Sequence, residues 1–307
     1  MFTESRVKRR KRKTAVSRDI GLEIGWICGK YFFNMQHLHY GYWTADLPVN
    51  LANVHLAQAN YVKFLMSHIP EGVKTILDVG CGTGQLAREL KNAGYKVDCI
   101  SPNAMFAERT RSLLGPESTI FECTFEQFST DKRYDLVMFA ESFQYIGAHN
   151  AINKSFDLLR DGGHLLICDY FAMPLPEKAG MSGGERWGRF TDVIAGSAFA
   201  SVEDIDVTEQ MAPTLDVVND IFKEALLPTV TLATRLATDR HPWLTKLVTW
   251  IYRKRIAKIN AKYFSGKTTG QTFKKCKSYR LLLYRKTGSA ADRLPAVDQS
   301  ASACTVE

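Results

Sequence analysis

Short apolar runs alternate with helical or turn-rich stretches through the middle of the chain. Runs of this length predict buried strands, and their alternation with helices predicts a parallel sheet covered on both faces. The expected fold class is therefore α/β, a Rossmann-like, seven-stranded, mostly parallel sheet with helices on both faces. The expected strands are Thr75–Val79, Lys96–Ile100, Thr119–Glu122, Tyr134–Phe139, His164–Tyr170, Ala200–Val207 and Tyr279–Tyr284.

Two helical segments flank or interrupt the expected sheet domain, which comprises residues 71–210 and 278–287. Residues 18–70 form an N-terminal helical segment rich in aromatic side chains, and residues 211–277 have helical periodicity. An insertion before the last strand reaches the carboxyl ends of the strands, where open α/β sheets bind ligands, so we expect a helical lid or substrate cap there. In the N-terminal segment, one face of a predicted helix carries Val54, Ala57, Tyr61, Leu65 and Ile69.

Composition limits the class of protein and its compartment. With 307 residues, 45% hydrophobic and 23% charged, the chain resembles ordinary globular proteins. It contains no run of about eighteen apolar residues that would span a membrane, and no signal-peptide pattern follows its basic N-terminus. Seven scattered cysteines without a CxxC pair predict reduced thiols, no metal site and a cytoplasmic protein. Residues 1–17 are expected to be a disordered basic arm and residues 288–307 a disordered tail.

The net charge of +8 is concentrated in two places. One is the basic run from Lys8 to Lys13. The other follows Asp239, beyond which no acidic residue occurs until Asp292 while Lys and Arg recur. A basic surface attracts the phosphates of nucleic acid, lipid headgroups or soluble anions, so these partners stay open beside a merely solvated surface.

The strongest motif is a glycine-rich turn. The predicted strand that ends in Asp78 is followed by Gly80, Gly82 and Gly84, and a helix begins directly afterwards. Glycines let the backbone turn tightly and approach a ligand closely, and the start of a helix offers free amides to an anionic group. The motif therefore predicts a ligand-binding turn at the end of the first strand.

Spacing alone leaves two ligands open. The GxGxxA pattern that begins at Gly82 also fits the dinucleotide fingerprint, and Asp98 lies near the distance expected for a ribose contact. Two features favour S-adenosylmethionine over NAD. Gly80 is a third, earlier glycine, and the carboxylate of Asp78 suits a ligand with an ammonium group, whereas it would repel a pyrophosphate.

Four segments resemble one family, the class I S-adenosylmethionine-dependent methyltransferases. The first motif of that family is similar to Leu77-Asp-Val-Gly-Cys-Gly-Thr-Gly84. The family's fourth strand resembles Tyr134-Asp-Leu-Val-Met-Phe139, and the segment before its fifth strand resembles Leu158-Leu-Arg-Asp-Gly-Gly-His-Leu-Leu166. The aromatic segment of relatives such as tocopherol, sterol and cyclopropane-fatty-acid methyltransferases resembles His37-Leu-His-Tyr-Gly-Tyr-Trp43. The resemblance covers roughly residues 37 to 285 and implies an enzyme that methylates a small molecule.

The resemblance also implies which residues bind the cofactor. In the family the glycine turn holds the methionine end, which here implies Asp78, Gly80, Cys81, Gly82, Thr83 and Gly84. The ribose is usually held by an acid near the end of the second strand, but Cys99 occupies that position. Because neighbouring residues of a strand face opposite sides, Asp98 is expected to point away, leaving Ser101 or Asn103 for the ribose.

The adenine site also departs from the family pattern. The segment after the third strand has no acid at the expected position. Thr124 and Phe125 are the candidates that the resemblance leaves, with the ring of Phe125 packing on the adenine.

Methyl transfer from a sulfonium needs alignment, exclusion of water and, for some acceptors, removal of a proton. We select Tyr42, Glu141 and Gln144 as candidate catalytic residues. Tyr42, with the neighbouring Tyr40 and Trp43, would hold the sulfonium by cation–π attraction or belong to the core. Glu141 and Gln144 follow the fourth strand, where the acceptor should lie, and Glu141 would serve as a base or cap a turn. Other candidate bases are His37, His39 and His149.

Two further features bear on the acceptor. The fourth strand is followed by Phe139-Ala-Glu-Ser-Phe143, without the Pro-Pro motif of methylases that act on base nitrogens, so no specific nucleic-acid partner is expected. Residues 241–258 mix Trp, Leu and Ile with a cationic set, which favours either an apolar-lined lid or a helix at an anionic membrane surface.

Either arrangement predicts a hydrophobic acceptor, such as a lipid, a prenylated ring, a polyketide or a similar natural product. An NAD-dependent oxidoreductase and a non-catalytic protein that binds the cofactor stay open as alternatives.

Overall fold

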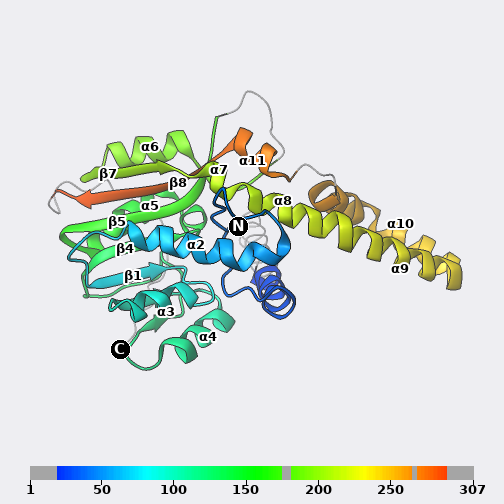
Figure 1. Ribbon diagram of the computed structural model, residues 1–307, viewed down its shortest axis with the longest axis horizontal. Helices are drawn as coiled ribbons and strands as arrows, with labels where there is room; N and C mark the ends of the chain where they lie inside the picture. The colour runs from blue at the N-terminus through cyan, green and yellow to red at the C-terminus, as the bar shows by residue number, and fades with distance from the viewer. Residues whose placement is uncertain (1–18, 175–180, 265–267, 289–307) are drawn as a thin grey trace, which may run out of the picture.

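The computed structural model describes residues 19–174, 181–264 and 268–288. Its centre is a sheet in the order β3-β2-β1-β4-β5-β8-β7, with β6 paired to β5 (Figure 1). Strands β1 to β6 pair in parallel, and β8 runs antiparallel to both of its neighbours. The strands are β1 Thr75–Val79, β2 Lys96–Ile100, β3 Ile120–Phe121, β4 Tyr134–Ala140, β5 Leu159–Ala172, β6 Glu185–Arg186, β7 Phe199–Asp206 and β8 Lys277–Lys286.

This sheet confirms the predicted α/β class. All seven predicted strands are present, and the first two have the predicted bounds. The additional strand, β6, is only two residues long and therefore too short to leave a periodic pattern. The predicted basic arm, residues 1–17, and the tail beyond residue 288 lie outside the described residues.

Helices cover both faces of the sheet. A helix over residues 19–33 precedes the first labelled elements. The helices of the sheet domain are η1 Leu51–Asn53, α2 Val54–Ser67, α3 Gln85–Asn92, α4 Ala104–Leu114, η2 Phe143–Tyr145, α5 Ala148–Leu158 and α6 Trp187–Ala195. The insertion contains α7 Thr208–Met211, α8 Pro213–Asp220, η3 Ile221–Leu226, α9 Leu227–Arg240, α10 Pro242–Ile259, η4 Asn260–Phe264 and α11 Gly270–Cys276.

The core has two layers, one on each face of the sheet. Strand β1 shows the alternation, because Leu77 and Val79 pack on the side of α5 and α6, whereas Ile76 packs on the side of α2 and α3. On the latter side, Tyr61 and Leu65 of α2 are fully buried. Burial of both faces explains why these strands are nearly continuous apolar runs in the sequence.

The strand order reverses direction between β1 and β4. Strands β2 and β3 lie to one side of this pair and β5 to the other. In open α/β sheets the crevice at such a reversal, outside the carboxyl ends of the strands, is where ligands bind. Here those ends carry Asp78 on β1 and Glu141 directly after β4.

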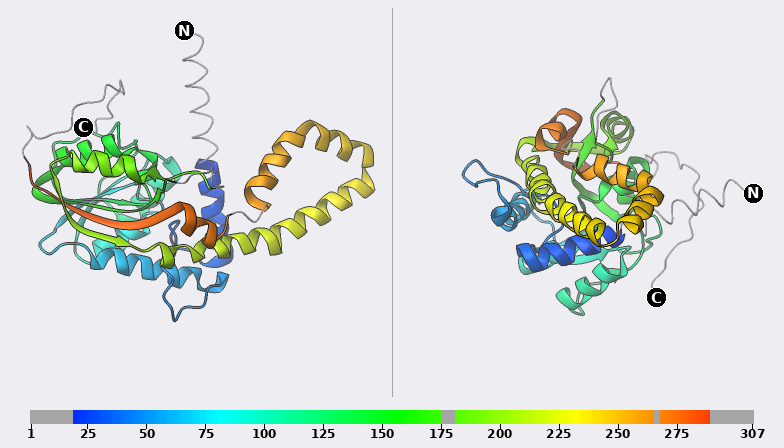
Figure 2. Two further views of the ribbon diagram at one scale, coloured as in Figure 1. Left: turned by 90° about the horizontal axis from the view of Figure 1, so that it is seen from above. Right: turned by 90° about the vertical axis from the view of Figure 1, so that its right-hand side faces the viewer.

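The insertion is helical, as predicted, but much of it does not cover the sheet. Helices α7, α8 and α11 pack against the body, whereas α9 and α10 form a hairpin that projects away from it (Figures 1 and 2). Side chains of the hairpin are exposed along nearly its whole length. The helices α9 and α10 therefore do not form the predicted cap over the carboxyl ends of the strands, because they make their contacts with each other and with η3 and η4.

Among the described residues, none of the helices is both long and apolar enough to cross a membrane.

Candidate functional site

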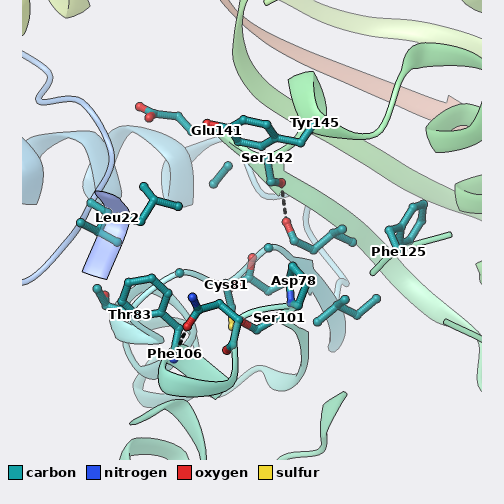
Figure 3. A pocket seen from close by; sticks show the side chains of 18 of the residues that line it. Leu22, Asp78, Cys81, Thr83, Ser101, Phe106, Phe125, Glu141, Ser142 and Tyr145 are labelled. Atoms are coloured by element: carbon teal, nitrogen blue, oxygen red, sulfur yellow. Dashed lines mark hydrogen bonds between the residues drawn. The ribbon is translucent and has the colours of Figure 1, made fainter. Parts of the chain in front are cut away.

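A cavity of about 330 Å³ lies at the strand-order reversal, where β1, β2 and β4 end. Figure 3 shows Glu141, Ser142 and Tyr145 on one side of it and Thr83, Ser101 and Phe106 on the other. Cavities of this size hold small molecules and cofactors. Residues from the helix over 19–33, the glycine turn and the loops after β2, β3 and β4 all contribute to its walls.

The three glycines of the turn have different reasons to lack a side chain. A Cβ on Gly80 would lie 2.6 Å from the Cβ of Ser142, and one on Gly84 would lie 2.5 Å from Oγ1 of Thr110. Those two glycines therefore allow the protein to pack on itself, and Gly84 does not line the cavity. A Cβ on Gly82 would meet no protein atom within 4 Å, so its bare backbone faces open space in the cavity.

The turn also presents hydrogen-bond donors. The amides of Gly80 and Cys81 both donate to the carbonyl of Ile100, at 2.9 and 3.2 Å. Within the described residues, the amides of Gly82 and Thr83 make no hydrogen bond, so these two donors are left for an anionic group of a ligand. The Thr83 hydroxyl is not left in this way, because it donates to the carbonyl of Gln36 at 2.9 Å.

Asp78 supplies an acidic group beside the turn. Its side chain lines the cavity, is almost fully buried, and its Oδ2 has no hydrogen-bond partner among the described residues. Burial raises the pKa of the Asp78 carboxyl from 3.8 to about 7. A buried carboxylate oxygen without a partner is costly unless a ligand completes it. The predicted contact of Asp78 with an ammonium group stays a prediction.

The second strand follows the predicted orientation. Asp98 lies away from the cavity, where it accepts hydrogen bonds from the Thr119 amide at 3.1 Å and the Tyr134 hydroxyl at 2.9 Å. Ser101 and Asn103 both line the cavity. Asn103 also caps α4, since its Oδ1 accepts from the Phe106 amide at 3.0 Å. The Ser101 hydroxyl donates to the Asn103 carbonyl at 3.3 Å, and its predicted contact with a ribose stays a prediction.

The loop after β3 brings both predicted adenine residues to the cavity wall. Thr124 lines it, and so does Phe125, whose ring packs edge to face on Phe139 with the centroids 5.3 Å apart. Glu126, the next residue, lines the cavity as well. Sequence reasoning did not select Glu126, because the predicted position for an adenine-binding acid lay elsewhere in the segment.

Glu141 has an unusual backbone conformation. Its φ of 59° lies in the left-handed region, which non-glycine residues rarely adopt. Its Oε1 accepts hydrogen bonds from the Tyr40 amide and the Tyr279 hydroxyl, both at 2.7 Å. Burial raises the pKa of the Glu141 carboxyl to about 8. Strain held in place by specific hydrogen bonds at a cavity wall is typical of functional positions.

The other two candidate catalytic residues lie outside the cavity wall. The Tyr42 ring stacks on Phe64 with centroids 4.8 Å apart, so it packs against α2 and does not face the cavity. Gln144 is held by Asp169, which accepts from its amide at 3.1 Å and from its side-chain nitrogen at 3.2 Å. Burial raises the pKa of Asp169 to about 7.

Two of the three candidate histidines line the cavity. The His37 imidazole lies 3.3 Å from a Glu89 carboxylate oxygen. His39 must donate from Nδ1, because its partner at 2.7 Å is the carbonyl of Tyr40, and its buried Nε2 has no hydrogen-bond partner among the described residues. Burial lowers the pKa of His39, so the ring is neutral. His149 on α5 is not part of the wall.

The cover of the cavity comes from a helix that the sequence did not single out. Leu22 of the helix over 19–33 lines the cavity. The helix is anchored to α4, because Trp26 stacks under the Arg109 guanidinium at 4.4 Å and Glu23 accepts from Asn103 at 2.9 Å. Its aromatic and apolar residues were visible in the sequence, but their spacing does not say which residues they cover.

A sequence profile described as a methyltransferase domain matches residues 54–207. The chain belongs to this methyltransferase domain family, and the match extends from α2 through β7. Membership confirms the predicted resemblance to class I S-adenosylmethionine-dependent methyltransferases, and with it the predicted cofactor class. It gives no support to the NAD-dependent alternative, for which Asp98 would have had to reach the cavity.

Relatives and solved structures agree with this assignment. An uncharacterized methyltransferase of Geobacillus sp. (strain WCH70) is 25% identical over 170 residues, 54% of this chain and 75% of the relative. Another methyltransferase relative from that strain is matched over 57% of its length. The fold is similar to the cyclopropane synthase MmaA2 from Mycobacterium tuberculosis (TM-score 0.58, 14% identity, 81% and 90% of the two chains). It is also similar to geranyl diphosphate C-methyltransferase from Streptomyces coelicolor A3(2) (0.57, 15%, 82% and 91%).

Proposed function

We propose that this protein binds S-adenosylmethionine and transfers its methyl group to a small, uncharged, hydrophobic acceptor by in-line displacement. One observation carries the proposal. The cavity combines a buried carboxylate oxygen of Asp78 that has no partner with the open backbone of Gly82. An acid and two free amides side by side complement an amino-acid group, which carries both an ammonium and a carboxylate.

The residues of the wall fit the parts of this cofactor. Asp78 would hold the ammonium, the amides of Gly82 and Thr83 the carboxylate, and Ser101 the ribose, with Phe125 beside the adenine. When bound, the cofactor supplies a methyl group on a positively charged sulfonium. Four acids line the cavity, and in their ionised forms they favour a cationic ligand electrostatically; they are Asp19, Asp78, Glu126 and Glu141.

The chemistry of the wall also limits the acceptor. Among the described residues that line the cavity, none is Lys or Arg, so nothing there would neutralise an acceptor with a phosphate or carboxylate group. Leu22, Leu38, Phe106 and Ile146 give the wall an apolar part. These residues of the wall support an uncharged, hydrophobic acceptor without any contribution from α9 and α10.

Glu141 is proposed to take the proton of the acceptor. Its Oε1 is already occupied by two donors, and no hydrogen bond to a described residue reaches Oε2, which leaves that oxygen for the acceptor. A pKa of about 8 keeps the carboxyl largely protonated at neutral pH, but a cation bound nearby favours its ionised form. Glu141 would therefore become a base when the cavity holds its cationic ligand. Gln144 is proposed to act indirectly, by holding Asp169 through two hydrogen bonds, because it lies outside the wall.

Two measurements test this function. Calorimetric titration with S-adenosylhomocysteine should show binding, and NADH should give none. A labelled-methyl assay against lipid and soluble extracts should then transfer label to an organic-soluble product. Binding without transfer to any fraction would favour the non-catalytic alternative, and the absence of binding would refute the proposal altogether.

A further inference from the structure

One end of the molecule carries exposed apolar side chains on two separate elements. The first is the helix over residues 19–33, whose Ile20, Ile24, Ile27 and Tyr31 recur at spacings of four, three and four residues and so lie on one helical face. They are 50%, 57%, 58% and 84% exposed. The opposite face, with the buried Trp26, packs on α4. This helix therefore shows a complete apolar stripe to the outside.

The second element is the hairpin of α9 and α10. On α10, Trp243, Leu247, Trp250 and Ile251 cluster on one side, and Trp243 and Trp250 are 70% and 62% exposed. Further exposed apolar residues on the hairpin are Leu227, Val230, Leu232, Leu236, Leu244, Val248, Ile256 and Ile259. Both elements lie at the end of the molecule from which the hairpin projects (Figures 1 and 2).

The charges of the hairpin are nearly all of one sign. Between residues 227 and 259 its only acid is Asp239, whereas its basic residues are Arg235, Arg240, Lys246, Arg253, Lys254, Arg255 and Lys258. Two such hairpins would repel each other, which opposes a second copy of this chain as the partner. An anionic surface that is apolar beneath its charges would satisfy both the cations and the tryptophans.

The threonine hydroxyls of the hairpin are hydrogen-bonded within their own helices and do not depend on water. Every threonine between residues 227 and 259 donates its hydroxyl to the main-chain carbonyl four residues earlier; these are Thr229, Thr231, Thr234, Thr238, Thr245 and Thr249. A hydroxyl that is satisfied within its own helix costs little to remove from water. The exposed helix therefore carries few polar groups, other than its charges, that need solvent.

We propose that the helix over 19–33 and the α9–α10 hairpin together dock this protein onto an anionic lipid bilayer. The tryptophans of α10 lie among the acyl chains near the headgroups, and the basic group that ends α10 contacts the phosphates. Because Leu22, on the opposite face of the docked helix, lines the cavity, this orientation leaves one helix between the lipid and the cavity. A hydrophobic acceptor then enters from the bilayer, and neither helix needs to cross it.

Co-sedimentation with vesicles tests the docking independently of methyl transfer. The protein should bind phosphatidylcholine vesicles that contain about 30% phosphatidylglycerol, and binding should weaken about tenfold or more without the anionic lipid or in high salt. Each basic residue near such a surface contributes roughly fivefold to binding. The hairpin variant is Arg253→Gln, Lys254→Gln, Arg255→Gln and Lys258→Gln, for which we expect a loss on the order of several hundredfold.

A control variant removes an equal number of positive charges from exposed positions outside the hairpin: Lys63→Gln, Arg186→Gln, Arg189→Gln and Arg285→Gln. It should bind vesicles within about threefold of the wild type, since these residues lie outside both docking elements. Equal losses in the two variants would mean that only net charge matters and would overturn the proposal. S-adenosylhomocysteine affinity should be unchanged in both variants, which verifies folding and separates this outcome from any failure of the proposed function.

A second variant tests the apolar contact. Trp243→Ser with Trp250→Ser should reduce binding to anionic vesicles about tenfold or more, and brominated acyl chains should quench the fluorescence of the wild type but much less that of this variant. The matched control is Val49→Ser with Val202→Ser, two exposed apolar residues away from the hairpin. If sedimentation velocity instead shows a dimer that the tryptophan variant abolishes, a second copy covers the hairpin and the proposal is wrong.

Discussion

The replacement Asp78→Asn measures both the stability lost by burying this carboxyl and its contribution to ligand binding. In the folded protein burial raises the pKa of Asp78 from 3.8 to about 7, so the folded state holds this proton more tightly than the unfolded state does. Stability contributed by the group therefore falls as the pH rises from about 4 to about 7. At about 1.4 kcal/mol per pKa unit, the cost of the wild-type carboxyl is about 2 kcal/mol at pH 5 and about 4 kcal/mol at pH 8.5.

Urea denaturation of the wild type and the Asp78→Asn variant at these two pH values measures the difference. Relative to the wild type, the variant should gain about 2–3 kcal/mol in unfolding free energy between pH 5 and pH 8.5. The cost of burying the amide is the same at both pH values and cancels. A gain close to zero would show that Asp78 is not buried as a neutral acid, and the reasoning about the site would fail.

The same replacement should remove the pH dependence of ligand binding. Wild-type affinity for S-adenosylhomocysteine should rise about tenfold between pH 6 and pH 8, because an ionised carboxylate attracts the ammonium and only about a tenth of Asp78 is ionised at the lower pH. The variant should bind more weakly, with little change across this range. A variant that is stabilised yet binds as well as the wild type would place the ammonium elsewhere.

Four further changes test individual residues in and around the site. Gly82→Val should lower S-adenosylhomocysteine affinity tenfold or more by calorimetry and cost about 1 kcal/mol of unfolding free energy in urea. Gly84→Val should cost about 1–3 kcal/mol of unfolding free energy because its side chain meets Thr110. If Gly82→Val cost more stability than Gly84→Val, the assignment of Gly82 to the ligand and of Gly84 to packing would be contradicted. Glu141→Gln should reduce kcat about a hundredfold or more with unchanged S-adenosylhomocysteine affinity, and a normal kcat would remove Glu141 as the base. Tyr42→Phe should leave turnover within about twofold, since the Tyr42 ring packs outside the cavity; a large loss would restore its predicted role.

The sequence predicted the structure well for strands that are buried on both faces of the sheet. Strands β1 and β2 match their predicted bounds because strands covered on both faces need apolar residues at nearly every position. The outward orientation of Asp98 followed from strand alternation alone, and its bonds to Thr119 and Tyr134 agree with it. Regular elements fix the direction of their side chains, so such predictions need no knowledge of the rest of the fold.

The site residues that differed from expectation lie where the backbone has no period. Tyr42 belongs to an irregular segment, so nothing in its spacing indicated that its ring would stack on Phe64 and not face the cavity. Gly84 was assigned with its neighbours to the ligand, but its partner is Thr110, which lies far along the chain. Contacts of this kind depend on how elements meet, and a single sequence does not encode them in any local pattern.

The cavity cover shows the same limit at the level of whole helices. The helix over 19–33 and helix α10 both have apolar faces, and amphipathicity identifies such a face without identifying what covers it. Anchoring decides between them: Trp26 and Glu23 hold the first helix on α4 beside the cavity, whereas the described part of the hairpin has no comparable anchor on the sheet. The apolar residues of the hairpin therefore need a partner from outside the described chain. If that partner is a bilayer, the predicted lid and the predicted membrane helix are two different helices. The helix over 19–33 covers the cavity, α10 inserts its tryptophans, and both lie at the membrane-facing end of the molecule.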